Sequence, residues 1–117
     1  MKAIPLLIVI LLMATCQHAA TSSSSSYIKV YKHDGAVQCG YTGVELDAME
    51  VELTNAGIDV VCSQKGHDGL MRAAVCGMNT GKLNIYTIDE KHLPEAVAIG
   101  FKSVAALAEY QDQECKK

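Results

Sequence analysis

The number and position of the cysteines constrain the fold of this chain more than any other feature. The 117 residues include five cysteines, of which Cys16 lies near the start. In an exported protein, an odd number of cysteines leaves at least one that cannot pair in a disulfide within the chain. If Cys16 carries lipid or is removed with a signal peptide, four cysteines remain, which is enough for two disulfides. These four residues are Cys39, Cys62, Cys76 and Cys115. With one Phe and no Trp the core is small, so bridges of about 2–4 kcal/mol each would contribute substantially to stability.

Strand parity indicates which cysteines pair. Cys62 lies on the apolar face of an expected strand over 58–64, whereas Cys76 lies opposite the apolar face of an expected strand over 70–76. The predicted bridges are Cys39–Cys76 and Cys62–Cys115. A β-bulge would reverse this parity, so other pairings stay open. A zinc site is the rival interpretation, but the chain has no Cys-x-x-Cys pair and its cysteine spacings do not match a zinc ribbon.

The first fifteen residues have the pattern of a secretory signal. Lys2 supplies a positive charge, and residues 3–13 are almost entirely apolar. As a helix this run would be about 16 Å long, whereas the hydrocarbon core of a bilayer is about 30 Å thick. The run is therefore too short to cross a membrane, and residues 1–15 are predicted to be a signal peptide.

The residues that follow the apolar run indicate where the signal ends. The segment Leu12-Met13-Ala14-Thr15-Cys16 resembles a bacterial lipobox, in which cleavage precedes a cysteine that then carries lipid. Ala14 fits the lipobox pattern and Met13 is tolerable, whereas Thr15 departs from the usual Gly or Ala. The resemblance implies a small exported lipoprotein that is anchored to the membrane through Cys16. Ordinary cleavage after Cys16 or Ser22 is the alternative, since each site has Ala at the −3 position.

Composition divides the rest of the chain into two parts. Residues 16–26 carry the cysteine and a small polar stretch that ends in five serines, which is typical of a flexible tether. Residues 27–117 are long enough for one α+β domain. The chain is half apolar, which argues against disorder, and its net charge of −3 argues against a nucleic-acid partner.

The pattern of apolar residues predicts the elements of this domain. A helix is expected over 46–56, where apolar residues recur at helical spacing, and Pro94 favours the start of a second helical segment that ends in a piece capped by Ser103. The expected strands are 27–32, a short returning strand 36–39, 58–64, 70–76 and 83–88. The order β-α-β-β-β-α predicts a small, mainly antiparallel sheet with helices on one face, stapled by disulfides. Ferredoxin-like folds also open with β-α-β-β.

A His-Asp-Gly triplet occurs twice, at 33–35 and 67–69. Asp-Gly is a strong turn signal, so we expect two turns with exposed histidines and no cofactor. The rival interpretation is a metal site, because imidazole and carboxylate groups bind zinc and other transition metals. Its candidate ligands are His33, Asp34, His67 and Asp68.

No motif in the sequence points to catalysis. The segment 77–82 lacks the spacing of a phosphate-binding loop, and export to an oxidising compartment favours disulfides over a reactive thiol. We therefore expect a non-catalytic module of the bacterial cell envelope, tethered by lipid or secreted. It would bind a protein, a peptide or a cell-wall ligand, or support a larger assembly. The alternative is a small exported enzyme that uses a metal at the His-Asp-Gly turns or a cysteine thiol.

Overall fold

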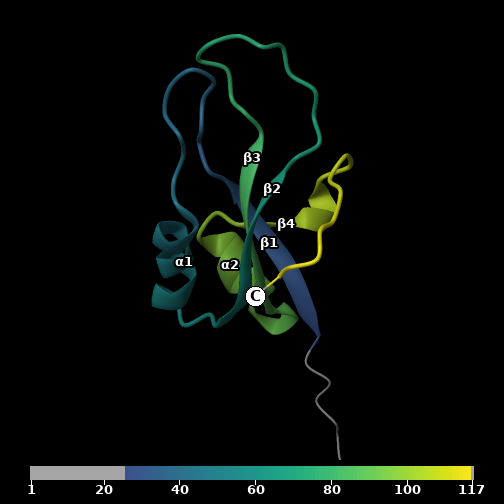
Figure 1. The fold of residues 1–117 in the computed structure, drawn as a ribbon. Helices are drawn as coiled ribbons and strands as arrows, with labels where there is room; N and C mark the ends of the chain where they lie inside the picture. The colour runs from purple at the N-terminus through teal and green to yellow at the C-terminus, as the bar shows by residue number, and fades with distance from the viewer. Residues whose placement is uncertain (1–25, 117) are drawn as a thin grey trace, which may run out of the picture.

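A four-stranded antiparallel sheet forms the centre of the molecule (Figure 1). The computed structural model describes residues 26–116. The strands are β1 (Tyr27–His33), β2 (Val60–His67), β3 (Lys82–Asp89) and β4 (Lys102–Ser103). The helices are α1 (Leu46–Asn55) and α2 (Leu93–Ala98), with 3-10 turns at η1 (Glu90–His92) and η2 (Val104–Ala106). In these residues no helix is both long and apolar enough to cross a membrane.

The order of the strands across the sheet is β2-β3-β1-β4. β1 and β2 are parallel to each other, because each pairs in antiparallel fashion with β3, which lies between them. The helix α1 connects β1 to β2, and α2 connects β3 to β4. This is the split βαβ arrangement of ferredoxin-like folds, and it confirms an α+β domain stapled by disulfides.

Successive side chains of the sheet contribute to two separate apolar clusters. On one face, strand residues pack against both helices; this cluster contains Val30, Met49, Leu53, Ile58, Tyr86, Ile88, Ala96 and Phe101. On the other face, Tyr31, Leu83 and Ile85 are covered by the C-terminal segment. The covering residues are Val104, Leu107 and Tyr110. The helices therefore lie on one face, as predicted, and the end of the chain closes the other.

Two expected strands are absent from the structure and one strand was not expected. Residues 70–76 form a loop rather than a strand, and most of their side chains are exposed. The short returning strand at 36–39 is reduced to a single bridge between Val37 and Asn79. The fourth strand of the sheet is β4, which has only two residues. The observed order is therefore β-α-β-β-α-β, because residues 70–76 lie in the loop between β2 and β3, where Cys76 is bonded to Cys39, and β4 pairs with the edge of β1.

Both predicted disulfides are present, with Cα–Cα distances of 5.0 Å for Cys39–Cys76 and 6.3 Å for Cys62–Cys115. The predicted face of Cys62 is nevertheless wrong. A bulge between Val60 and Cys62 shifts the register, so that Val60 faces Ile88 and Cys62 faces Thr87. Cys62 consequently lies on the face that the C-terminal segment covers, where it reaches Cys115.

Candidate functional site

Two long loops project together from one end of the sheet (Figure 1). We define the double loop as residues 34–45, between β1 and α1, and residues 68–81, between β2 and β3. The Cys39–Cys76 disulfide joins the two segments. Two backbone hydrogen bonds beside the disulfide also join them, from Gln38 N to Met78 O (2.9 Å) and from Gly77 N to Gln38 O (2.8 Å). The double loop is therefore one cross-linked unit.

The two His-Asp-Gly triplets form equivalent turns at the base of the double loop, which confirms the turn interpretation. Asp34 Oδ1 accepts a hydrogen bond from Ala36 N (2.8 Å), and Asp68 Oδ1 accepts one from Leu70 N (3.0 Å). Each aspartate also donates its own N–H to the segment that begins β3, Asp34 to Lys82 O and Asp68 to Gly81 O. The triplets thus flank β3 as a matched pair, because they end the two strands on either side of it.

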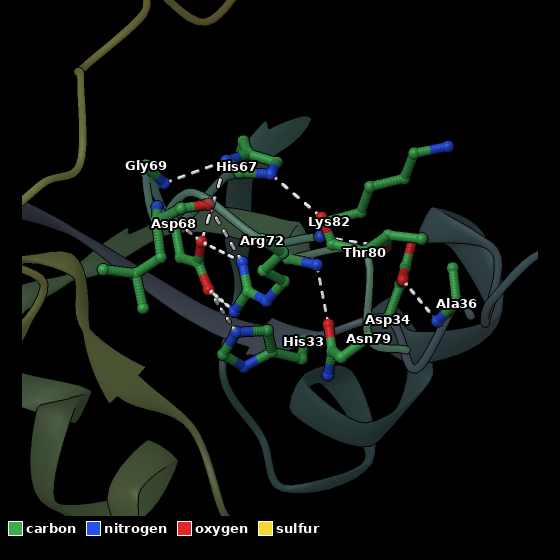
Figure 2. Close-up of polar contacts among 12 residues, drawn as sticks. His33, Asp34, Ala36, His67, Asp68, Gly69, Arg72, Asn79, Thr80 and Lys82 are labelled. Carbon is green, nitrogen blue, oxygen red and sulfur yellow. Dashed lines mark hydrogen bonds and ion pairs between the residues drawn. The ribbon is translucent and has the colours of Figure 1, made fainter. Parts of the chain in front are cut away.

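Asp68 is the most heavily engaged group of this site (Figure 2). It is 2% exposed, and its carboxylate accepts hydrogen bonds from both terminal nitrogens of Arg72, with Nη1–Oδ1 at 2.8 Å. His33 Nε2 donates to Oδ2 at 3.0 Å. The Arg72 guanidinium, helped by His33 and the Leu70 N–H, holds the pKa of Asp68 well below its usual range, although burial opposes this shift. Asp68 is therefore a fixed anion that positions the loop around it.

Asp34 is as deeply buried as Asp68, but its cationic partner, Lys65, is more exposed than Arg72. Its Oδ2 accepts a hydrogen bond from Lys65 Nζ at 3.1 Å, and the Lys65 side chain is 47% exposed. A cleft of about 480 Å³ opens beside this pair. Its lining consists of Asp34, Thr42, Glu45, Lys65, Gly66, His67 and Lys82. The two carboxylates in the lining are matched by the two lysines, so the cleft presents no excess of either charge.

Both ring nitrogens of His67 are hydrogen-bonded to backbone groups of the double loop. Its Nδ1 accepts from Gly69 N (2.9 Å), and its Nε2 donates to the carbonyl of Thr80 (2.9 Å) (Figure 2). A metal would displace one of these bonds, because both ring nitrogens are engaged. Within residues 26–116 no group of three or more His, Cys, Asp or Glu residues is arranged to hold a metal ion. The triplets bring His33 and Asp68 together, but not the four candidate ligands around one point.

The surface of the double loop is unusually apolar. Met71 is completely exposed, and four other large apolar or aromatic side chains of the double loop are also exposed: Tyr41, Leu70, Val75 and Met78. The remaining large apolar side chains that are exposed in the described residues are Tyr27, Val51, Val61 and Val97, which lie one by one on β1, α1, β2 and α2. Apolar surface is therefore concentrated on the double loop.

Arg72 is the important residue that the sequence interpretation did not identify. Its spacing of four residues from Asp68 was the available signal, but that spacing indicates an ion pair only within a helix. Here the chain between them is a loop, and the pair forms because the turn at Asp68 directs the chain back over the carboxylate. Cys16, the predicted lipid-anchor residue, and the predicted signal peptide lie outside the described residues.

Comparison of the chain with protein-family models, with curated proteins and with solved structures finds no match. The two disulfides indicate an oxidising compartment outside the cytoplasm. The fold itself carries no functional assignment, because one fold supports many functions.

Proposed function

We propose that this protein is a non-catalytic binding module of the bacterial cell envelope, tethered through lipid on Cys16, whose double loop binds a partner protein. The observation that carries the proposal is the set of exposed apolar side chains on a cross-linked loop pair, with Met71 completely exposed. A concentration of exposed apolar side chains on one part of a surface is typical of interaction sites. A loop that is already rigid loses little conformational entropy when it binds.

The polar groups of the double loop support binding rather than catalysis. Asp34 and Asp68 are buried and are engaged by cations and backbone N–H groups, so neither is positioned as a free acid or base. Each of the four cysteines in residues 26–116 is in a disulfide, so this part of the chain offers no thiolate nucleophile. The enzyme alternative therefore has less support than the binding module.

Site-specific photo-crosslinking tests the binding surface. A photo-crosslinking amino acid is placed at Met71 and, as the matched control, at Val97, which is 52% exposed on α2. In cells that naturally make the protein, we expect one discrete heterologous adduct from position 71 and none from position 97. Equal adducts from both positions, no adduct from position 71, or an adduct of two copies of this chain would contradict the proposal.

The lipid anchor is tested separately from the binding surface. We expect wild-type protein in the membrane fraction and Cys16→Ser protein in the soluble fraction. Intact mass of the mature wild-type chain provides the direct control, because it reports both the cleavage site and the lipid. A soluble wild type whose mature chain starts beyond Cys16 would disprove the anchor and leave the double-loop proposal unaffected.

A further inference from the structure

We infer, building on the proposed function, that the partner of the double loop is a serine peptidase with an apolar primary pocket, and that residues 69–75 bind it as a substrate-like inhibitory loop. Met71 would enter the pocket, and the bond between Met71 and Arg72 would lie at the peptidase serine. The inference rests on how the structure holds the chain on both sides of this bond.

The Met71 side chain projects into solvent, while the Leu70 backbone and the Arg72 side chain beside it are held by Asp68. The side chain of Met71 is completely exposed. On one side, Leu70 N donates to Asp68 Oδ1 at 3.0 Å. On the other side, the Arg72 side chain is only 20% exposed, because it turns back to Asp68. An unbranched apolar side chain that projects from a fixed segment is the shape that a deep apolar pocket accepts.

The segment is also fixed beyond Arg72. Gln38 Nε2 donates to the Ala73 carbonyl at 3.0 Å, and Cys76 is bonded to Cys39. Both contacts come from residues 34–45, the other segment of the double loop, so the segment that carries Met71 is held in place by its neighbour. Backbone movement on binding is small in peptidase–inhibitor complexes, and a segment fixed in advance meets that condition.

The Asp68–Arg72 pair spans the bond that a peptidase would cut. In the reaction, the peptidase serine gives its hydroxyl proton to the peptidase histidine as its oxygen attacks the Met71 carbonyl carbon. The bond to the Arg72 nitrogen then breaks, and the histidine passes that proton to the departing amine. In an ordinary substrate the amine diffuses away and water hydrolyses the ester. Here the Arg72 guanidinium remains bonded to Asp68 and to the Leu70 carbonyl, on the other side of the cut.

The retained amine changes the outcome of the reaction. Because the amine stays beside the ester, it attacks the Met71 carbonyl carbon and gives a proton to the histidine. The peptide bond re-forms as the bond to the serine oxygen breaks, and the histidine returns the proton to that oxygen. The loop would therefore occupy the peptidase without being consumed. The same contacts restrain Arg72 from entering the acidic pocket of a trypsin-like peptidase, which selects chymotrypsin-like over trypsin-like partners.

The test uses the mature protein against chymotrypsin, subtilisin and trypsin, with a small chromogenic substrate as the readout. We expect inhibition of at least one of the first two and none of trypsin. Met71→Asp should weaken inhibition by about 30-fold or more, as expected for a residue that dominates an interface, while Met71→Leu should retain it. Arg72→Ala should turn the inhibitor into a substrate, with cleavage after Met71 about tenfold faster or more. The unfolding midpoint of each variant shows whether the variant is folded.

Three results would overturn the inference. The first is that neither chymotrypsin nor subtilisin is inhibited. The second is equal inhibition by wild type and Met71→Asp, and the third is rapid cleavage of the wild type after Met71. These results are distinguishable from failure of the proposed function. If a discrete adduct still forms at position 71 in the crosslinking experiment, the binding surface stands and the peptidase partner is wrong. If neither inhibition nor an adduct is seen, both proposals fall.

Discussion

The sheet-and-helix body and the double loop are stabilised in different ways. In the body, large apolar side chains such as Leu53, Tyr86 and Phe101 are completely buried. In the double loop, no large apolar side chain is buried. The buried residues there are Asp34, Ala36, Gly43, Asp68 and Gly81. The loop is therefore held mainly by a disulfide, ion pairs and turns; Val44 packs against the core, but most of the large apolar side chains of the loop face solvent. A surface whose apolar groups are not needed for folding is available for binding.

Removing a core side chain from the body should have the largest effect on stability. Phe101 is completely buried and lies edge-on to Tyr86, with ring centroids 5.9 Å apart. Phe101→Ala should lower the free energy of unfolding by about 3–5 kcal/mol, through lost burial and the cavity left behind. Met71→Ala, the matched change on the double loop, should change it by less than about 0.5 kcal/mol. Chemical denaturation measures both. Similar losses in the two variants would mean that the loop contributes to the core after all.

Removing the central anion of the double loop should have the next largest effect. Asp68→Ala leaves the largely covered Arg72 guanidinium without its partner, so we expect a loss of about 3 kcal/mol. Asp34→Ala should cost less, about 1–2 kcal/mol, because its partner Lys65 is half exposed and can be hydrated. Hydrogen exchange should place the loss in residues 68–81. If Asp34→Ala lost more stability than Asp68→Ala, the exposure of the cationic partner, Lys65 or Arg72, would not explain which aspartate matters more.

The same carboxylate should make stability depend on pH. The pKa of Asp68 is lowered in the folded state, chiefly by Arg72, below the ordinary Asp value of about 3.9. Its contribution is therefore complete above about pH 5 and is lost as the pH falls through 3.9 towards the folded pKa. Denaturation at about pH 5 and pH 3 should show a smaller acid-induced loss in Asp68→Asn than in wild type. Lys29 lowers the pKa of Asp112 as well, but that side chain is 67% exposed, so Asp112→Asn is the control with a small effect.

Much of the body could be predicted from the sequence, because its elements have local signals. The helix starts at Leu46 and the long strands lie within a few residues of their expected positions. The Cys39–Cys76 and Cys62–Cys115 pairings were also predicted correctly. Their justification was less complete, since the bulge before Cys62 depends on how β2 meets β3 and leaves no pattern within β2 itself.

The double loop was harder to predict, because its structure depends on contacts between distant segments. The apolar residues at 70–76 have the local pattern of a strand, but a strand requires a partner edge that only the complete fold supplies. The triplets were correctly interpreted as turns. Their contact with each other was missed, because His33 meets Asp68 only after β1 and β2 are placed on either side of β3.

The two glycines of the triplets give a finer comparison within the double loop. Both have positive φ, +80° at Gly35 and +83° at Gly69. A Cβ at Gly35 meets only Tyr41 at 3.9 Å, whereas one at Gly69 would overlap the backbone carbonyl of Glu109. Gly35→Ala should therefore cost about 1 kcal/mol and Gly69→Ala about 2 kcal/mol, because only the second adds a clash to the strain. Thermal and chemical denaturation of the two variants measure this order. Equal costs would show that the C-terminal segment moves aside freely.

The smallest effects concern the histidines, which the turn interpretation alone predicts to be almost silent. Their side chains are 37% exposed at His33 and 48% exposed at His67. The structure separates them, because His33 donates to a buried carboxylate whereas the partners of His67 are backbone groups that water can reach. His33→Ala should cost about 1 kcal/mol and His67→Ala about half of that.

A double-mutant cycle identifies the source of the His33 effect. In an Asp68→Asn background, His33→Ala should lose most of its cost, which gives a coupling of about 0.5–1 kcal/mol, whereas His67→Ala should cost the same in both backgrounds. A chelator should leave wild-type stability unchanged, because the histidine bonds are made to protein groups. If the chelator instead reproduced the loss caused by both histidine substitutions, the metal interpretation of the triplets would replace the turn interpretation. The direct bond from His33 to Asp68 would then be replaced by a metal ion that both residues bind.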